Sequence, residues 1–201
     1  MRIFRPSPMA AVAWTALTLS AVLALSACGG GADEAAPTPT VPPGFEVPAG
    51  VTLTEPGSTV KVGQSATFVY ELRDGVASAV TATVDAIEQG SIAEDFAFFT
   101  LDEQTEASTP YYVTVSLTNE GPAGLGAAAV PFVVHDDQNT IAPPNTVTGT
   151  FPPCENRELP ESFLPGEQAT VCLVFLVPEG RALVSIDSRS KDTSRAISWT
   201  P

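Results

Sequence analysis

The stretch that decides the fold is YYVTVSLTN, which spans Tyr111–Asn119. Apolar and polar side chains alternate along it, and alternate residues of an extended chain point to the same side. The apolar side chains that share one face are Tyr111, Val113, Val115 and Leu117. The intervening residues, beginning with Tyr112, fall on the opposite face, which we expect to meet solvent. This period of two predicts a half-buried antiparallel strand.

Similar runs recur along the chain and are separated by Gly, Pro, Asn and Asp. They are Thr59–Val62, Ser65–Leu72, Val80–Glu88, Val130–His135, Thr170–Val177, Ala182–Asp187 and Arg195–Thr200. About eight short strands with such turns predict an all-β domain, an antiparallel β-sandwich or barrel. Val171–Val177 is apolar on both faces, so we expect it in the middle of a sheet. The single predicted helix is Ser91–Phe98, with Ser91 as N-cap and Glu94 completing a capping box.

The chain opens with a segment typical of a bacterial lipoprotein signal. Arg2 and Arg5 precede an uncharged run over residues 9–24, and Leu25-Ser26-Ala27-Cys28 follows. A membrane-spanning helix needs about 20 apolar residues, and this run is shorter. We therefore predict that residues 1–27 are removed and that Cys28 carries a diacylglycerol, which anchors the chain to the outer side of the cell membrane. The alternative is an ordinary cleaved signal with Cys28 incidental.

Two further parts follow the signal. Residues 28–50 begin with the lipidated cysteine, are rich in proline and glycine, and show no apolar period, which predicts a flexible linker. Residues 51–201 have the length of one domain and carry the predicted strands. The expected organisation is a signal, a tether and one extracytoplasmic β-sandwich.

The charge of the chain excludes several functions. It has 9 basic and 23 acidic residues, a net charge of −14, and loss of Arg2 and Arg5 with the signal would make it −16. Nucleic acid and anionic lipid headgroups both require basic surfaces, so neither is an expected partner. After the signal only one histidine, His135, and no methionine remain. This composition argues against a copper or zinc protein, and we expect no cofactor.

Cys154 and Cys172 are the two cysteines left once Cys28 is acylated. An extracytoplasmic compartment permits their oxidation, and closing a loop of about twenty residues stabilises a fold by about 3 kcal/mol. We interpret them as a structural disulfide. A redox pair is the alternative, but the Cys-x-x-Cys spacing is absent.

The densest polar cluster follows the predicted strand Val130–His135. The carboxylate and amide oxygens of Asp136, Asp137 and Asn139 could bind Ca²⁺, although Asp and Asn also form turns without metal. His135 could act as a general base, but a triad also needs a nucleophile, and the Gly-x-Ser-x-Gly motif is absent. We therefore predict no catalytic residue and keep the calcium site as the weaker alternative to a bare turn.

Two other sets of charged residues each have a functional and a structural interpretation. The carboxylates of Asp95, Asp102, Glu103 and Glu106 could hydrolyse glycosides, but we favour a solvated acidic rim, with Phe96, Phe98 and Phe99 in the core. Four basic residues lie near the C-terminus, namely Arg181, Arg189, Lys191 and Arg195. They could contact an acidic polymer, or they could simply balance the acidic body.

Several segments resemble a known family. They are Val84–Gly90, Thr109–Val113, Leu164–Glu167, Val174–Gly180 and Ile197-Ser198-Trp199, with the motif Tyr112–Gly121. Over roughly residues 58–201 they resemble actinobacterial lipoproteins with an immunoglobulin-like domain of unknown function, similar in fold to secreted mycobacterial immunoprotective antigens. The resemblance implies the Cys154–Cys172 pairing and brings no catalytic residues. Trp199 follows both cysteines, so the antibody Cys-Trp-Cys core is absent.

These observations predict a lipid-anchored, non-catalytic binding module for a protein or envelope component. The alternative is a structural or accessory subunit of an envelope complex. A hydrolase that uses acidic residues is the third hypothesis.

Overall fold

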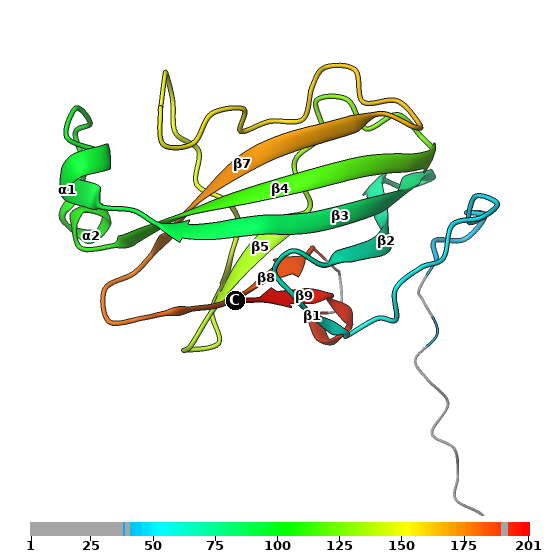
Figure 1. Cartoon of the computed structure of the whole chain (residues 1–201), viewed down its shortest axis with the longest axis horizontal. Helices are drawn as coiled ribbons and strands as arrows, with labels where there is room; N and C mark the ends of the chain where they lie inside the picture. Colours follow the sequence, from blue (N-terminus) through cyan, green and yellow to red (C-terminus); the bar gives the residue numbers. More distant parts are fainter. Residues whose placement is uncertain (1–37, 39–40, 190–192) are drawn as a thin grey trace, which may run out of the picture. The chain divides into compact units, whose positions relative to one another are not determined.

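The computed structural model describes residue 38, residues 41–189 and residues 193–201. Two sheets pack face to face (Figure 1). The four-stranded sheet has the order β2 (Ser65–Arg73), β3 (Val76–Gln89), β4 (Thr109–Pro122), β7 (Gln168–Val177). The five-stranded sheet has the order β1 (Thr59–Lys61), β9 (Ser198–Thr200), β8 (Leu183–Ser188), β5 (Phe132–Asp136), β6 (Ile141–Ala142). The predicted all-β sandwich is therefore confirmed.

All neighbouring strands are antiparallel except β1 and β9, which run parallel. Each predicted strand segment contains a strand, although the last begins only at Ser198 because Thr193–Arg195 form a 3₁₀ turn. The short strand β6 was not predicted, since two residues carry no periodic pattern. No helix in the described part of the chain is long and apolar enough to cross a membrane.

The fold-deciding stretch lies in β4, between β3 and β7. Val113, Val115 and Leu117 are fully buried between the two sheets, as their alternation predicts. From the facing sheet, Trp199 reaches the same core and stacks edge-on against Phe132 at a centroid distance of 5.6 Å. Burying such apolar surface is the main stabilising contribution to a sandwich.

The prediction that Val171–Val177 lies in the middle of a sheet is wrong. This segment forms β7, the edge strand of the four-stranded sheet. Its outer face is partly buried because the loop over residues 143–157 covers it, and the same loop closes its edge. Asn145 donates to the Val174 carbonyl at 2.7 Å and accepts from the Leu176 amide at 2.9 Å, while the Cys172 amide donates to Asn156. The apolar pattern predicted the burial of this strand correctly but its place in the sheet incorrectly.

Tyr112 departs from the alternation in a similar way. It lies on the outer face of the sheet, yet only 6 % of it is exposed. It belongs to a second hydrophobic cluster outside the sandwich, together with Phe96, Phe151, Cys154 and Val174. Phe96, Phe151 and Cys154 join this cluster from outside the strands, where the sequence carries no periodic signal.

The predicted helix is present but shorter than expected. Helix α1 spans Ile92–Asp95, with Ser91 as its N-cap accepting from the Glu94 amide. It ends at Phe96 because this side chain turns inward to the second cluster. A second one-turn helix, α2 (Glu103–Glu106), was not predicted; its N-cap is Asp102.

Candidate functional site

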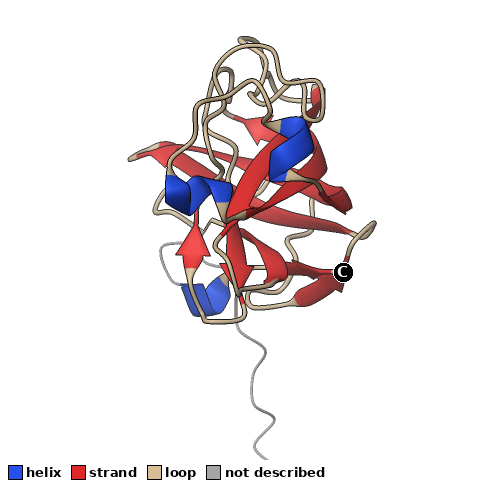
Figure 2. Cartoon of the chain, turned by 90° about the vertical axis from the view of Figure 1, so that its left-hand side faces the viewer, coloured by secondary structure: helices blue, strands red, loops and turns tan. Residues whose placement is uncertain are grey.

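The β3–β4 connection, residues 91–108, carries both short helices beyond one end of the sheet, and Figure 2 looks onto that end. We call this segment the acidic tip, because it contains five acidic residues and no basic one. Phe98, within the tip, is 100 % exposed. Burying a phenylalanine side chain stabilises a protein by about 2 kcal/mol, and Phe98 does not contribute this energy to the fold. Its exposure therefore needs an explanation.

The tip is braced by aromatic contacts immediately beside Phe98. Phe96 is buried and lies 4.8 Å from the ring of Phe151, and Phe99 lies 5.9 Å from the same ring. Tyr112 of β4 contacts Phe151 from the sheet at 5.7 Å. These tilted and edge-on pairs have the geometry that aromatic rings prefer. Phe98 is thus flanked by two rings that hold its backbone against the sandwich.

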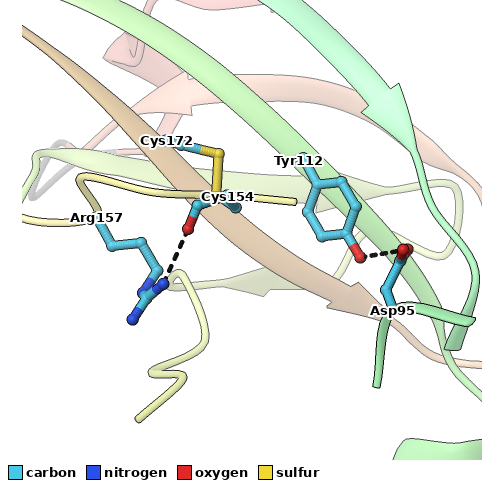
Figure 3. Close-up of a disulfide and its surroundings, with 5 residues drawn as sticks. All are labelled: Asp95, Tyr112, Cys154, Arg157 and Cys172. Carbon is cyan, nitrogen blue, oxygen red and sulfur yellow. Dashed lines mark hydrogen bonds between the residues drawn. A yellow bond between two sulfur atoms is a disulfide. The ribbon is translucent and has the colours of Figure 1, made fainter. Parts of the chain in front are cut away.

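A hydrogen bond joins the tip to the sheet at the same place (Figure 3). The Tyr112 hydroxyl donates to Asp95 Oδ2 at 2.7 Å, and the Ser91 amide donates to the same oxygen at 2.8 Å. Burial, this hydrogen bond and the Asp95 charge all raise the pKa of Tyr112 above its ordinary value of 10.0. Gly90 permits the contact, because a Cβ there would lie 2.5 Å from Asp95 Oδ2 and from Tyr112 Cε2.

The Cys154–Cys172 disulfide fixes the loop that supplies Phe151 (Figure 3). The two Cα atoms are 5.4 Å apart, and Cys154 is buried in the second cluster. Arg157 adds to this attachment by donating to the carbonyls of Cys154, Val147 and Gly149 at 2.9, 3.0 and 2.7 Å. The predicted disulfide thus holds the loop whose Phe151 packs against the acidic tip.

The acidic side chains of the tip fall into two groups. Asp95 and Asp102 are held by hydrogen bonds; the Thr105 amide donates to Asp102 at 2.7 Å and lowers the pKa of this carboxyl group. Glu94, Glu103 and Glu106 are exposed. The surface around Phe98 is therefore negative, which favours a positively charged counterpart.

The candidate calcium residues form the turn after β5. Asp136 accepts from Arg181 at 2.9 Å and from the amides of Gln138 and Thr140 at 3.0 and 2.7 Å. Asp137 accepts from the Ala182 amide, and the Asn139 side chain contacts His135. Among the residues that the structure describes, no group of three His, Cys, Asp or Glu side chains is placed to hold a metal. The side-chain oxygens of these residues take part in hydrogen bonds that stabilise the turn.

The pKa of Asp136 reflects opposing effects. Desolvation by itself would raise it, but the hydrogen bond from Arg181 and those from the Thr140 and Gln138 amides outweigh burial and lower the pKa. This carboxylate is a structural acceptor that ties the turn to the start of β8.

His135 is not paired with a nucleophile. Its Nδ1 lies 3.6 Å from Asp187 Oδ2, while the neighbouring Ser185 hydroxyl donates to Asp187 at 2.7 Å. A serine protease arrangement would instead place the serine hydroxyl on the histidine.

The predicted basic group is divided, because Arg189 and Arg195 line one groove beside β2 while Arg181 lies at the turn after β5. Arg181 pairs with Asp136, Arg195 donates to the Thr38 carbonyl, and Arg189 lies near Tyr70. Lys191 lies outside the described residues, as does Cys28, whose acylation stays a prediction.

Sequence reasoning missed the exposure of Phe98 by assigning all three phenylalanines of the tip to the core. Phe96 and Phe99 do pack inward, but Phe98 does not. The available signal was the sequence Phe96-Ala97-Phe98-Phe99, which lies between the acidic residues Glu94 and Asp95 on one side and Asp102 and Glu103 on the other.

Comparison with known proteins adds one likeness. No family model matches the chain, and no curated protein matches it. Among solved structures, the 1.5 Å crystal structure of MPT63, a secreted protein from Mycobacterium tuberculosis, is similar, with a TM-score of 0.43 and 14 % identity. The similarity covers 71 % of this chain and 96 % of that one.

Proposed function

We propose that this chain is a non-catalytic binding module that docks a protein partner through the acidic tip, with Phe98 as the anchor. The observation that carries the proposal is the full exposure of Phe98 beside the buried Phe96 and the half-buried Phe99, whose rings contact each other at 5.5 Å. Interface energies are concentrated in a few aromatic or arginine side chains that enter a pocket on the partner. A braced backbone also lowers the cost of ordering the tip on binding.

The charge around the anchor defines the partner. Glu94, Glu103 and Glu106 are exposed on the tip, so the partner should offer an apolar pocket with a basic rim. The same charges disfavour insertion of Phe98 into an anionic membrane surface. A protein is therefore the better counterpart for this site.

The proposal includes the location predicted from the signal. Lipidation of Cys28 would hold the module at the outer side of the bacterial membrane, and residues 28–50 would give it reach. The Cys154–Cys172 bond supports an oxidising compartment, where such bonds persist. As a hydrolase the tip is a poor candidate, because Asp95 and Asp102 are occupied as acceptors.

Photo-cross-linking tests the proposal. Benzoylphenylalanine replaces Phe98 in the full chain in intact cells, and Ile141, an exposed apolar residue of the other sheet, is the matched control position. We expect a discrete protein adduct from position 98 that is absent from position 141. A stoichiometric membrane protein in the adduct would favour the accessory-subunit alternative, and a soluble protein would favour a receptor. The absence of an adduct at position 98, or identical adducts at both positions, would contradict the proposal.

A further inference from the structure

A partner that docks on Phe98 also meets the surface beside it. A stable protein interface covers about 800 Å² on each partner, which is a circular patch of about 16 Å in radius. Phe99 follows Phe98 directly, and its ring lies 5.9 Å from the ring of Phe151, in the loop over residues 143–157. Part of this loop therefore falls within a patch centred on Phe98.

The loop lies beside the acidic tip because the two segments share the second hydrophobic cluster. Phe99 enters this cluster from the tip, and Val147 and Phe151 enter it from the loop. The residues next to these inward-facing side chains, 148–150 and 152–153, are exposed. We call them the neutral loop surface, because none of them is charged.

Several contacts hold the backbone of the neutral loop surface in place (Figure 3). The Arg157 guanidinium donates to the carbonyls of Val147 and Gly149, which precede Phe151, and to the carbonyl of Cys154, which follows it. The disulfide attaches Cys154 to β7. A surface that is ordered before binding loses less conformational entropy when a partner covers it.

Charge differs between the two parts of the surface around Phe98. The acidic tip contains five acidic residues and no basic one, whereas residues 143–153 contain no charged residue. A basic group of the partner gains a carboxylate counterpart over the tip. Over the neutral loop surface the same group would lose hydration without gaining a counter-charge. The charge pattern therefore fits a partner that is basic on one side only.

We infer that the partner protein docks across Phe98 onto the neutral loop surface, with basic groups where it meets α1 and α2 and uncharged groups where it meets residues 148–153. This inference rests on the proposed function and specifies the partner that the anchor accepts. Because a partner turned the wrong way would place its basic groups over the uncharged side, the charge pattern also fixes the orientation of docking.

Photo-cross-linking tests the extent of the docking surface. Benzoylphenylalanine replaces Thr150 in one full chain and Phe98 in another, in intact cells. The control position is Leu164, an exposed apolar residue in the turn that contacts Asn119, near the end of β4 remote from the tip. We expect positions 98 and 150 to capture the same protein, and position 164 not to capture it.

Binding of purified full-length variants to the protein captured at position 98 tests the charge pattern. Thr150→Glu places a carboxylate on the neutral loop surface, and Thr150→Gln is the size-matched control without charge. We expect Thr150→Glu to bind about tenfold more weakly than Thr150→Gln, because the added charge would be covered without a basic counterpart. Glu106→Gln removes a carboxylate from the tip and should weaken binding about threefold at about 50 mM salt, with little difference at about 500 mM.

Thr150 and Glu106 are both exposed, so urea unfolding of these variants should match that of the wild type. A Thr150→Glu variant that binds as tightly as Thr150→Gln, or more tightly, would overturn the one-sided charge pattern. Capture at position 98 without the same protein at position 150, or with equal capture at position 164, would overturn this inference and leave the Phe98 anchor in place. The absence of capture at position 98 would overturn both.

Discussion

The Tyr112 hydroxyl donates a 2.7 Å hydrogen bond to the Asp95 carboxylate, and this contact attaches the acidic tip to the central strand β4. The phenol comes from the outer face of the sheet and the carboxylate from the last residue of α1. Because the tip carries the proposed anchor, the stability of this attachment determines how firmly Phe98 is presented.

Tyr112→Phe should lower the free energy of unfolding at pH 8 by about 1–2 kcal/mol, because the half-buried Asp95 carboxylate loses a hydrogen-bond donor. The pKa of Tyr112 is raised above 10.0 in the folded chain, so its contribution is complete below pH 10 and is lost as the pH rises above that value. The difference between wild type and variant should therefore shrink above pH 10. Urea unfolding at pH 8 and pH 10.5 measures it, with Tyr111→Phe as the control. A difference that grows with pH would contradict this account.

Gly90→Ala should destabilise the chain by about 1–3 kcal/mol, as overpacking does in well-packed regions. The added Cβ would lie 2.5 Å from both Asp95 Oδ2 and Tyr112 Cε2. Gly124→Ala is the matched control, since its Cβ would lie no closer than 3.4 Å to Leu164. Thermal unfolding compares the two, and equal melting temperatures would show that the contact does not constrain position 90.

Reduction of the Cys154–Cys172 bond, whose sequence separation is 18, should lower the unfolding free energy by about 3 kcal/mol. The loop that holds Phe151 should loosen first, because the bond attaches this loop to β7. Hydrogen exchange with and without reductant locates the effect. Exchange that increases uniformly, without preference for residues 143–157, would contradict the role assigned to the disulfide.

Much of the sandwich could be predicted from the sequence because alternation reports burial directly. The period of two placed Val113, Val115 and Leu117 in the core. Alternation cannot tell what covers a buried face. For this reason the sequence predicts β7 in the centre of a sheet and Tyr112 on the solvent side. In the structure β7 is an edge strand, and the loop over residues 143–157 covers both β7 and Tyr112.

The candidate site was less predictable, for a related reason. Phe96, Phe98 and Phe99 have the same hydrophobicity, and their different positions depend on the ring of Phe151, which is distant in sequence. The Ser91 cap was predicted because its partners are local. Local capping chemistry could be predicted here, but the long-range contacts could not.

The ion pair of Asp136 with Arg181 should make the chain sensitive to acid. The pKa of Asp136 is lowered from 3.8 on folding, so its contribution is present above pH 3.8 and is lost as the pH falls through the lower native value. Arg181→Met removes one of the groups that lower the pKa, and it should flatten the loss of stability below pH 4. Urea unfolding between pH 2.5 and pH 6 tests this expectation. An unchanged slope would show that Arg181 does not hold the carboxylate.

The most direct test of the account is the affinity of purified full-length Phe98→Ala for the protein captured by cross-linking from position 98. Because this side chain is fully exposed, the unfolding free energy should stay within about 0.5 kcal/mol of wild type. Loss of an aromatic anchor should weaken binding about 100-fold, which corresponds to about 2.7 kcal/mol. An unchanged Kd in a folded Phe98→Ala variant would contradict the central claim that this side chain anchors the partner.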